Sequence, residues 1–236
     1  KNVDRIAEMI GKDFGHRCAE ETKLLEVFTS VDGIRDAKKK LSKWMAPEKR
    51  HVSMLFATGK NRVIPQPKGV VGIVVPWNYP LFLLMGPLTS ALAAGNRCMV
   101  KMAANSTNLC QFLAGRFAEV FPEDTVAILP GVKGTDFSSL PFDHILFTGS
   151  ADAGRNVMRA AAENLTPVTL ELGGKSPTVV CDDFDVETAR VADERGVTDA
   201  DRPPRRHPDP RHLAHPAIAG GHLQVPARSA SGARLC

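Results

Sequence analysis

The sequence has few features that would direct it to a secreted, metal-binding or membrane class. Its five cysteines form no CxxC pair and have no ligand spacing with histidine, so neither a disulfide framework nor a metal site is expected. No apolar run reaches the ~18 residues of a membrane span, so no membrane association is expected. No signal peptide opens the chain, and it begins at Lys1 rather than Met. We therefore expect a cytoplasmic protein with buried thiols and a cut N-terminus.

Lysine and aromatic residues are also missing from the last part of the chain. Residues 191–236 contain no Lys, Phe, Trp or Tyr, but seven Arg, six Pro and four of the seven His. Such a segment cannot bury enough apolar surface to offset its chain entropy, so a disordered tail is expected. Arg, Pro, Ala, His and Gly are what G+C-rich DNA encodes out of frame, which favours a frameshift near residues 190–196. A natural basic linker or tail is the alternative.

A further interpretation of this tail is a patch that binds nucleic acid or metal. Its net charge is only +2, from seven Arg against five acidic residues, and it offers no aromatic ring for base stacking. His207, His212 and His215 alternate with prolines and share no helical face. The formal charge of the whole chain, +4, is also mild. We therefore expect no nucleic-acid partner.

The first 190 residues read as two folded segments. Within residues 1–57, apolar residues such as Ile6, Met9 and Ile10 recur at the three- and four-residue steps of a helix. From Lys68 onward, short apolar strands alternate with helices, which predicts an α/β fold whose parallel sheet is covered on both faces. Such sheets bind nucleotides at the carboxyl ends of their strands. We predict a helical segment (1–67), a dinucleotide-binding domain (68–190) and an aberrant tail (191–236).

The predicted elements of this domain have definite bounds. The expected strands are residues 70–75, 98–101, 125–129, 144–147, 168–171 and 178–181, and the expected helices are residues 81–94, 107–120 and 151–164. The strands are short and nearly all apolar, as befits the interior of a parallel sheet.

Four motifs follow one another along this frame. They read PWNYP (76–80), AAGNRCMVK (93–101), FTGSADAG (147–154) and ELGGKSP (171–177). In this order and at these separations they resemble the aldehyde dehydrogenase superfamily, most closely its class 3 branch and the bacterial coniferyl aldehyde dehydrogenases. The resemblance covers about residues 20–190. It implies a Rossmann-like cofactor domain, NAD or NADP as cofactor, and a small-molecule aldehyde, such as the aromatic coniferyl aldehyde, as substrate.

Two residues are candidates for catalysis. Asn78 follows a strand end, where a side-chain amide can donate to a developing oxyanion, although it could equally serve as a turn former. Glu171 precedes a Gly-Gly turn that can present its carboxylate to a cavity, where burial would raise its pKa and suit it to activating water. An ordinary ion-paired Glu is the alternative. The resemblance implies the oxyanion role for Asn78 and the role of hydrolytic base for Glu171.

The cofactor site is expected to include six residues. Lys101 ends a buried strand and can donate to a ribose or a phosphate, or it can be a snorkelling surface lysine. Gly149, Ser150 and Gly154 lie where a strand meets a helix, whose N-terminus attracts an anion, and Ser150 can also cap that helix. Trp77 is expected to be a wall residue. The remaining cofactor contact that we assign is Leu172.

One position departs from the family pattern. The family often places a Glu three residues after the lysine of the second motif, where it holds the ribose hydroxyls, and this chain has Ala104. A carboxylate there would repel a 2′-phosphate. Its absence predicts little discrimination between NAD and NADP.

The nucleophile is missing. The resemblance implies a cysteine thiolate that attacks the aldehyde, usually roughly thirty-odd residues after the catalytic Glu in a Gly-Gln-x-Cys-like turn. At that distance this chain reads DRPPRR (201–206), and Cys236 lies 65 residues after Glu171. Cys98 and Cys181 are expected in the core. The sequence thus predicts a truncated, inactive aldehyde dehydrogenase that lacks the segments of a family homodimer. A non-catalytic nucleotide-binding module and an acyl-thioester reductase are the alternatives.

Overall fold

The computed structural model describes residues 2–15 and 17–173. Two units make up the chain: residues 1–147 with 157–169, and residues 148–156 with those from 170 onward. The expected strand at 178–181, the disordered tail and the frameshift all fall outside the described residues. Among the residues that are described, no helix combines the length and the apolar character of a membrane span.

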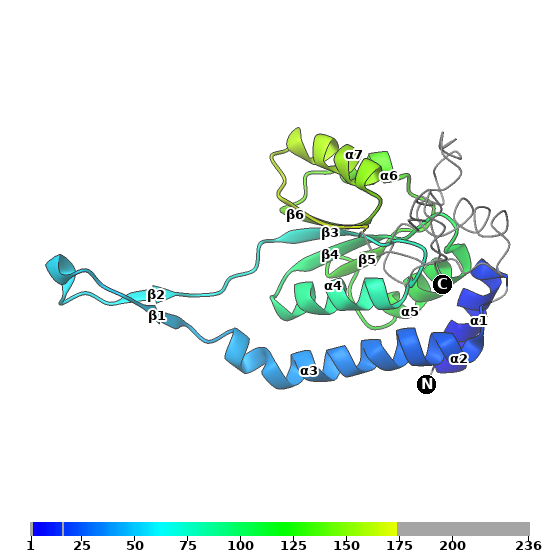
Figure 1. Cartoon of the computed structure of the whole chain (residues 1–236), viewed down its shortest axis with the longest axis horizontal. Coiled ribbons are helices and arrows are strands. Elements are labelled where there is room, and N and C mark those ends of the chain that lie inside the picture. Colours follow the sequence, from blue (N-terminus) through cyan, green and yellow to red (C-terminus); the bar gives the residue numbers. More distant parts are fainter. Residues whose placement is uncertain (1, 16, 174–236) are drawn as a thin grey trace, which may run out of the picture. The chain divides into compact units, whose positions relative to one another are not determined.

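A five-stranded sheet forms the centre of the fold (Figure 1). Its strand order is β5-β4-β3-β6-β7, and β3 pairs in parallel with β4 on one side and β6 on the other. Ile73, Val100 and Ile145 are fully buried, which explains why these strands are apolar on both faces. The parallel sheet predicted from the sequence is confirmed. The strands are β3 (Val70–Val74), β4 (Arg97–Lys101), β5 (Val126–Ile128), β6 (His144–Gly149) and β7 (Val168–Leu172).

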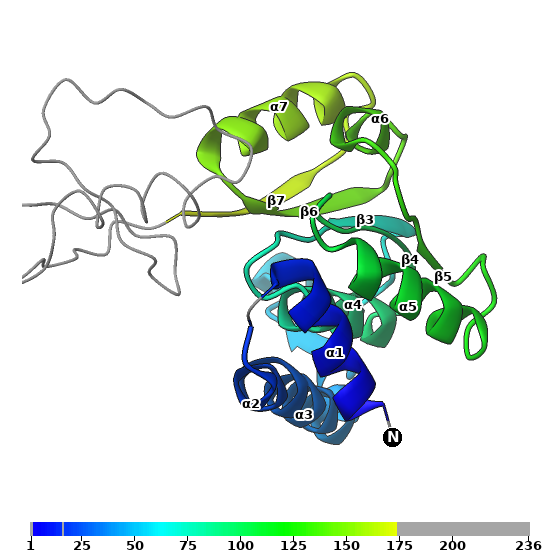
Figure 2. The ribbon, with the colours of Figure 1, turned by 90° about the vertical axis from the view of Figure 1, so that its right-hand side faces the viewer.

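Four helices cover one face of this sheet (Figure 2). Helix α1 packs against α5, and α3 packs against α4. Leu84, Leu88 and Leu109 project from α4 and α5 into the core and are fully buried. The bounds are α1 (Val3–Phe14), α3 (Thr29–Trp44), α4 (Phe82–Ala93) and α5 (Thr107–Ala118).

The opposite face carries α6 (Gly134–Ser138) and the carboxyl half of α7 (Ala151–Ala162) (Figures 1 and 2). Phe137 on α6 is fully buried, and its ring centroid lies 4.9 Å from that of Phe142. Val157 and Ala161 of α7 are buried as well. The sheet is therefore covered on both faces, as the pattern of apolar strands predicts.

The N-terminal helices are joined by an unusual turn. A short helix, α2 (Ala19–Glu21), leads into the π-helix η1 (Thr22–Phe28), which continues directly as α3. The π-helix is a rare conformation, and many of its known occurrences lie at functional sites. In this one, a charged residue, Glu26, is fully buried.

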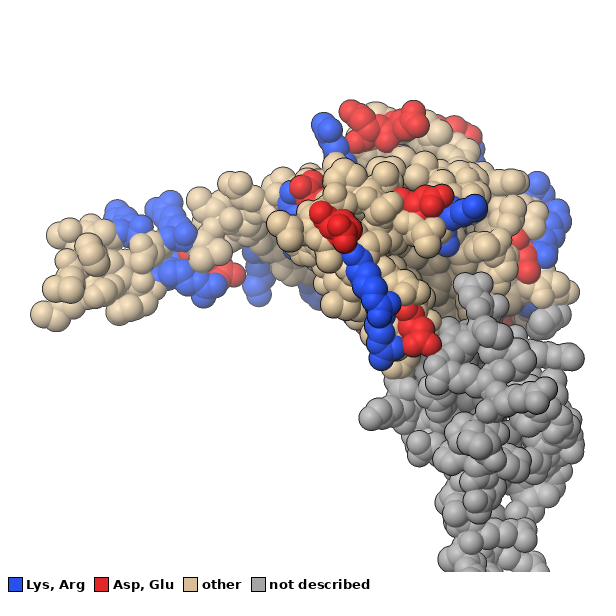
Figure 3. Space-filling model, turned by 90° about the horizontal axis from the view of Figure 1, so that it is seen from above, with Lys and Arg blue, Asp and Glu red and all other residues tan. Residues whose placement is uncertain are grey.

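The predicted helix over residues 1–57 is wrong beyond Trp44. Strands β1 (Glu48–Arg50) and β2 (Asn61–Val63) form an antiparallel ribbon instead, joined through a short 3-10 turn, η2 (Met54–Phe56). Pro47 explains the change, because the residue before a proline is driven away from helical backbone angles. The ribbon extends beyond α3, away from the sheet (Figure 1), and Lys and Arg side chains gather on it (Figure 3).

Candidate active site

The sheet brings two of the predicted site residues to one edge. Val74 of β3 stands opposite Lys101 of β4 in the parallel register, and the Val75 N–H donates to the Lys101 carbonyl at 2.9 Å. The turn that contains Trp77 and Asn78 therefore begins beside Lys101. Because β4 and β6 flank β3 on opposite sides, the chain reverses its order at β3, and α/β sheets bind ligands at such a point.

Asn78 retains hydrogen-bonding capacity. Its side chain is half-buried, and its Oδ1 atom is buried without a hydrogen-bond partner among the described residues. A buried polar atom without a partner costs about 1–3 kcal/mol, so native proteins keep few of them. An amide in this state at the carboxyl edge of β3 fits a group that binds a ligand. It also lies within a bend over residues 77–79, so the turn-forming role and the ligand-binding role are compatible.

Lys101 is a second polar group at this edge. Its side chain is half-buried and takes part in no salt bridge within the described part of the chain. A Cβ atom placed on Gly134 would lie 3.9 Å from Lys101 Nζ, so the ammonium group lies beside the first residue of α6. Ala104 is exposed in the turn that follows β4, and its carbonyl accepts a bond from Thr107 Oγ1 at 2.9 Å. The edge thus offers a cation with no carboxylate at position 104.

The third motif forms the junction of β6 and α7. Gly149 is the last residue of β6, and Ser150 Oγ accepts the Ala153 N–H at 3.2 Å, so Ser150 does cap the helix. Gly154 is buried, and its N–H donates to the Ser150 carbonyl at 2.9 Å. The capping role of Ser150 is therefore confirmed. The predicted cofactor contacts of these three residues stay predictions.

The fourth motif lies at the end of the described residues. Glu171 and Leu172 are the last two residues of β7, and both side chains are exposed. The described residues therefore do not bury the Glu171 carboxylate, and its burial in a cavity stays a prediction. The turn from Gly174 onward, which was expected to shape its cavity, lies outside them.

Two of the three described cysteines, Cys98 and Cys110, cannot provide a nucleophile. Cys98 and Cys110 are buried, as expected for Cys98, and burial raises the pKa of the Cys98 thiol to about 11. Burial likewise raises the pKa of Cys110. Since the thiolate is the reactive form, neither side chain is a nucleophile near neutral pH. Cys18 is exposed, and Cys181 and Cys236 lie outside the described residues.

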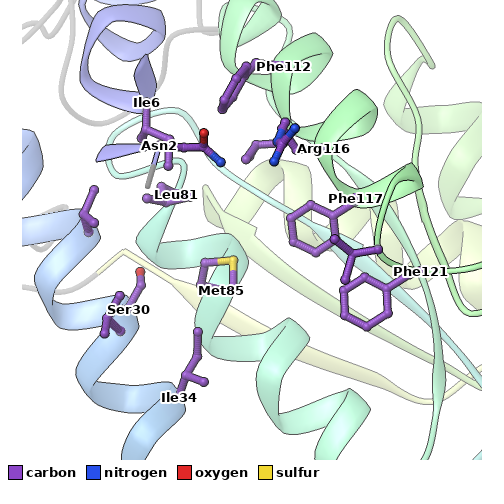
Figure 4. Close-up of a pocket in the computed structure, with 14 residues that line it drawn as sticks. Asn2, Ile6, Ser30, Ile34, Leu81, Met85, Phe112, Arg116, Phe117 and Phe121 are labelled. Atoms are coloured by element: carbon purple, nitrogen blue, oxygen red, sulfur yellow. The ribbon is translucent and has the colours of Figure 1, made fainter. Parts of the chain in front are cut away.

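A pocket of about 290 Å³ opens elsewhere in the molecule (Figure 4). It lies among α1, α3, α4 and α5, and apolar side chains such as Ile34, Met85 and Phe117 line it. Its lining includes no carboxylate, cysteine or histidine and none of the predicted site residues. This pocket therefore lacks the groups that acid–base or nucleophilic chemistry needs. Within residues 2–15 and 17–173, no group of three or more metal-ligating side chains occurs either.

The sequence motifs missed the residues that hold the Asn78 turn. Glu26 accepts the N–H groups of Leu81 and Phe82, just after the turn, at 2.7 and 3.2 Å. The Phe14 ring lies 6.0 Å from that of Trp77. A charged residue between the apolar Leu25 and Val27 was the one signal that could have found Glu26.

A doubly wound parallel sheet with polar side chains at its switch point defines a nucleotide-binding α/β protein. The sequence model of the aldehyde dehydrogenase family matches residues 1–196, and the chain belongs to this family. A probable coniferyl aldehyde dehydrogenase of Pseudomonas aeruginosa is 52% identical over 191 residues, 80% of this chain and 40% of that protein. The coniferyl aldehyde dehydrogenase of a Pseudomonas species is 43% identical over 182 residues, 76% of this chain and 37% of that protein.

Solved structures agree with this assignment. The aldehyde dehydrogenase of Mycobacterium tuberculosis complexed with NAD+ aligns with a TM-score of 0.66 and 33% identity, over 81% of this chain and 39% of that one. The present chain thus spans about 40% of the length of the curated relatives that it matches.

Proposed function

We propose that this chain is the cofactor-binding part of an NAD- or NADP-dependent aldehyde dehydrogenase that oxidises an aromatic aldehyde of the coniferyl type to its carboxylic acid. The observation that carries the proposal is that the parallel register of β3 and β4 brings Lys101 and the turn that contains Asn78 to the switch point of the sheet, where Asn78 Oδ1 has no hydrogen-bond partner among the described residues. The names of the relatives support the substrate class.

Each site residue has a task in this proposal. Asn78 donates its amide N–H to the oxygen of the aldehyde as negative charge develops there. Lys101 and Trp77 bind the dinucleotide at the carboxyl ends of β3 and β4. Gly149, Ser150, Gly154 and Leu172 are the other proposed cofactor contacts. When bound, NAD or NADP supplies the hydride acceptor. Glu171 removes a proton from the water that releases the acid.

The chain as it stands is proposed to be inactive. The reaction requires a thiolate that attacks the carbonyl carbon. Cys98 and Cys110 are buried thiols with raised pKa, and Cys18 lies in the N-terminal helical segment, before the motifs of the proposed site. We expect no reduction of NAD or NADP when the chain is mixed with aromatic or aliphatic aldehydes, measured by absorbance of the reduced cofactor. Turnover that survives purification and disappears in Cys236→Ser would contradict this expectation and identify a nucleophile outside the described residues.

A non-catalytic nucleotide-binding module is the second candidate. The raised pKa values of Cys98 and Cys110 favour it, because these two buried thiols cannot supply the nucleophile beside the proposed cofactor edge. The two candidates are separated by two measurements on a chain whose reading frame has been restored. Calorimetric titration with NAD and NADP measures cofactor binding, and an aldehyde assay measures turnover. Binding without turnover in the restored protein supports the module, and aldehyde-dependent cofactor reduction supports the dehydrogenase.

The cellular setting belongs to the same proposal. Cys18, Cys98 and Cys110 are free thiols, which supports a reducing compartment such as the cytoplasm. The proposed partners are a small-molecule aldehyde and, for a full-length protein, a second copy in a homodimer. No nucleic acid and no membrane are proposed as partners.

A further inference from the structure

A fully buried carboxylate lies next to the Asn78 turn. The side chain of Glu26, on η1, is 0% exposed. Its Oε2 atom accepts the N–H groups of Leu81 and Phe82 at 2.7 and 3.2 Å, and its Oε1 atom accepts a bond from Arg17 at 3.1 Å. Burial raises the pKa of the Glu26 carboxyl, against the effect of these three donors. Burying a charged group is costly unless hydrogen bonds satisfy it, and here Leu81, Phe82 and Arg17 supply those bonds.

Glu26 holds the start of a helix. Helix α4 begins at Phe82, and the N–H groups of a first helical turn have no partner within the helix. The side chain of Glu26 reaches them from 55 and 56 residues earlier in the chain and satisfies them with a negatively charged acceptor. The positive end of the helix dipole strengthens this contact. The carboxyl end of the Asn78 turn is therefore fixed to η1.

Arg17 extends the same cluster over the turn itself. Its guanidinium carbon lies 4.0 Å from the centroid of the Phe14 ring and 4.8 Å from that of Tyr79, which follows Asn78 directly. Such contacts between a cation and an aromatic face are attractive. Phe14 in turn contacts Trp77, which precedes Asn78. Both neighbours of Asn78 are thus held by groups that are linked to Glu26.

We propose that Glu26 is a positioning residue for Asn78. Through Leu81, Phe82 and Arg17 it fixes the turn on both sides of Asn78, so that the side-chain amide keeps one place at the carboxyl edge of β3. Glu26 itself touches no reacting atom. The consequence for oxyanion binding rests on the function proposed above, but the mechanical role is independent of it.

The fluorescence of Trp77 reports on this turn. The chain has two tryptophans, and Trp44→Phe leaves Trp77 as the only one. In this background we compare Glu26→Ala, which removes the acceptor, with Glu26→Gln, which keeps an acceptor oxygen and removes the charge. The expected result is that acrylamide quenches Trp77 severalfold more strongly in Glu26→Ala and to an intermediate degree in Glu26→Gln. Circular dichroism checks that each variant is folded.

Asp13→Asn is the matched control. The Asp13 carboxylate caps α5 in the same way, because it accepts the N–H groups of Asn108 and Leu109 at 2.8 and 3.0 Å. The Asp13→Asn variant should leave the acrylamide quenching of Trp77 unchanged. Folded Glu26 variants with wild-type quenching would overturn the proposal, and so would an equal effect of Asp13→Asn.

A measurement on the unmutated chain covers the case in which the Glu26 variants do not fold. The amide protons of Leu81 and Phe82 should exchange with solvent only through global unfolding. Exchange at these two amides much faster than global unfolding overturns the proposal. None of these experiments requires turnover or a bound cofactor. A turn that loosens in Glu26→Ala, in a protein that binds neither NAD nor NADP after frame restoration, would support the positioning role and contradict the proposed enzyme.

Discussion

Leu165 carries backbone strain that a single substitution should relieve. Its φ of 54° lies in the left-handed region, where a Cβ atom is unfavourable, and 89% of its side chain is exposed. Leu165→Gly removes the Cβ atom and loses little packing, so we expect the free energy of unfolding to rise by about 0.5–1 kcal/mol in urea denaturation. Leu55→Gly, at an equally exposed position without positive φ, should not stabilise the protein. A loss of stability in Leu165→Gly would contradict the argument.

Single residues were predictable where their signal is local. Asn78 and Lys101 stand in short motifs that end strands, and the structure places both at the carboxyl edge of the sheet. Glu26 was not predictable in this way, because its partners lie 55 residues away. In the same segment, the apolar Leu24 and Phe28 are 61% and 60% exposed, while Thr22 and Glu26 are fully buried.

Strand β3 has a position that cannot accept even a methyl group. A Cβ atom on Gly72 would lie 2.8 Å from the ring of Phe142, which packs across the sheet face below α6. Gly72→Ala should therefore lower the free energy of unfolding by about 1–3 kcal/mol through overpacking. Gly86→Ala in α4 is the control, since a Cβ atom there meets nothing within 4 Å and should stabilise the helix. Urea denaturation measures both, and recovery in Gly72→Ala/Phe142→Leu would identify the clash as the cause.

The elements of the sheet were predictable and the ribbon was not. Apolar runs of five or six residues can be satisfied only inside a covered sheet, and each described strand lies within a residue or two of its expected bounds. Residues 48–63 lack such a run. Their pairing depends on the match between two short polar segments, Glu48–Arg50 and Asn61–Val63, whose register no apolar face specifies. Their strand character therefore left no pattern in the sequence.

At the scale of the whole molecule, the sequence predicts the parallel sheet and the position of the motifs at its carboxyl edge. The parallel sheet follows from the alternation of apolar strands with helices, and the motifs at the strand ends then fall at its carboxyl edge. The order of the strands came only from the structure. The environment of Glu171 could not be predicted in the same way. A carboxylate at the last described strand is buried or exposed according to what covers it, and local sequence does not encode that cover.

Global stability should depend on pH through His144, which links three parts of the sheet edge. Its Nε2 atom is 2.8 Å from Thr169 Oγ1 on β7, and its Nδ1 atom is 3.1 Å from Lys68 Nζ before β3. Burial lowers the pKa of His144, and the Lys68 charge lowers it further. The imidazole is therefore harder to protonate in the folded chain than in the unfolded chain, where a histidine has a pKa of about 6.5.

The direction of the effect follows from this order of pKa values. Below pH ~6.5 the unfolded chain takes up a proton that the folded chain resists, so the free energy of unfolding should fall as the pH drops through the lowered pKa of His144. Glu26 acts in the opposite direction, because its pKa is raised. The His144 contribution is therefore measured as the difference between the wild type and His144→Gln in urea denaturation at several pH values between 7 and 5. That difference should shrink as the pH falls. Parallel curves for wild type and His144→Gln would show that His144 is protonated equally easily in both states.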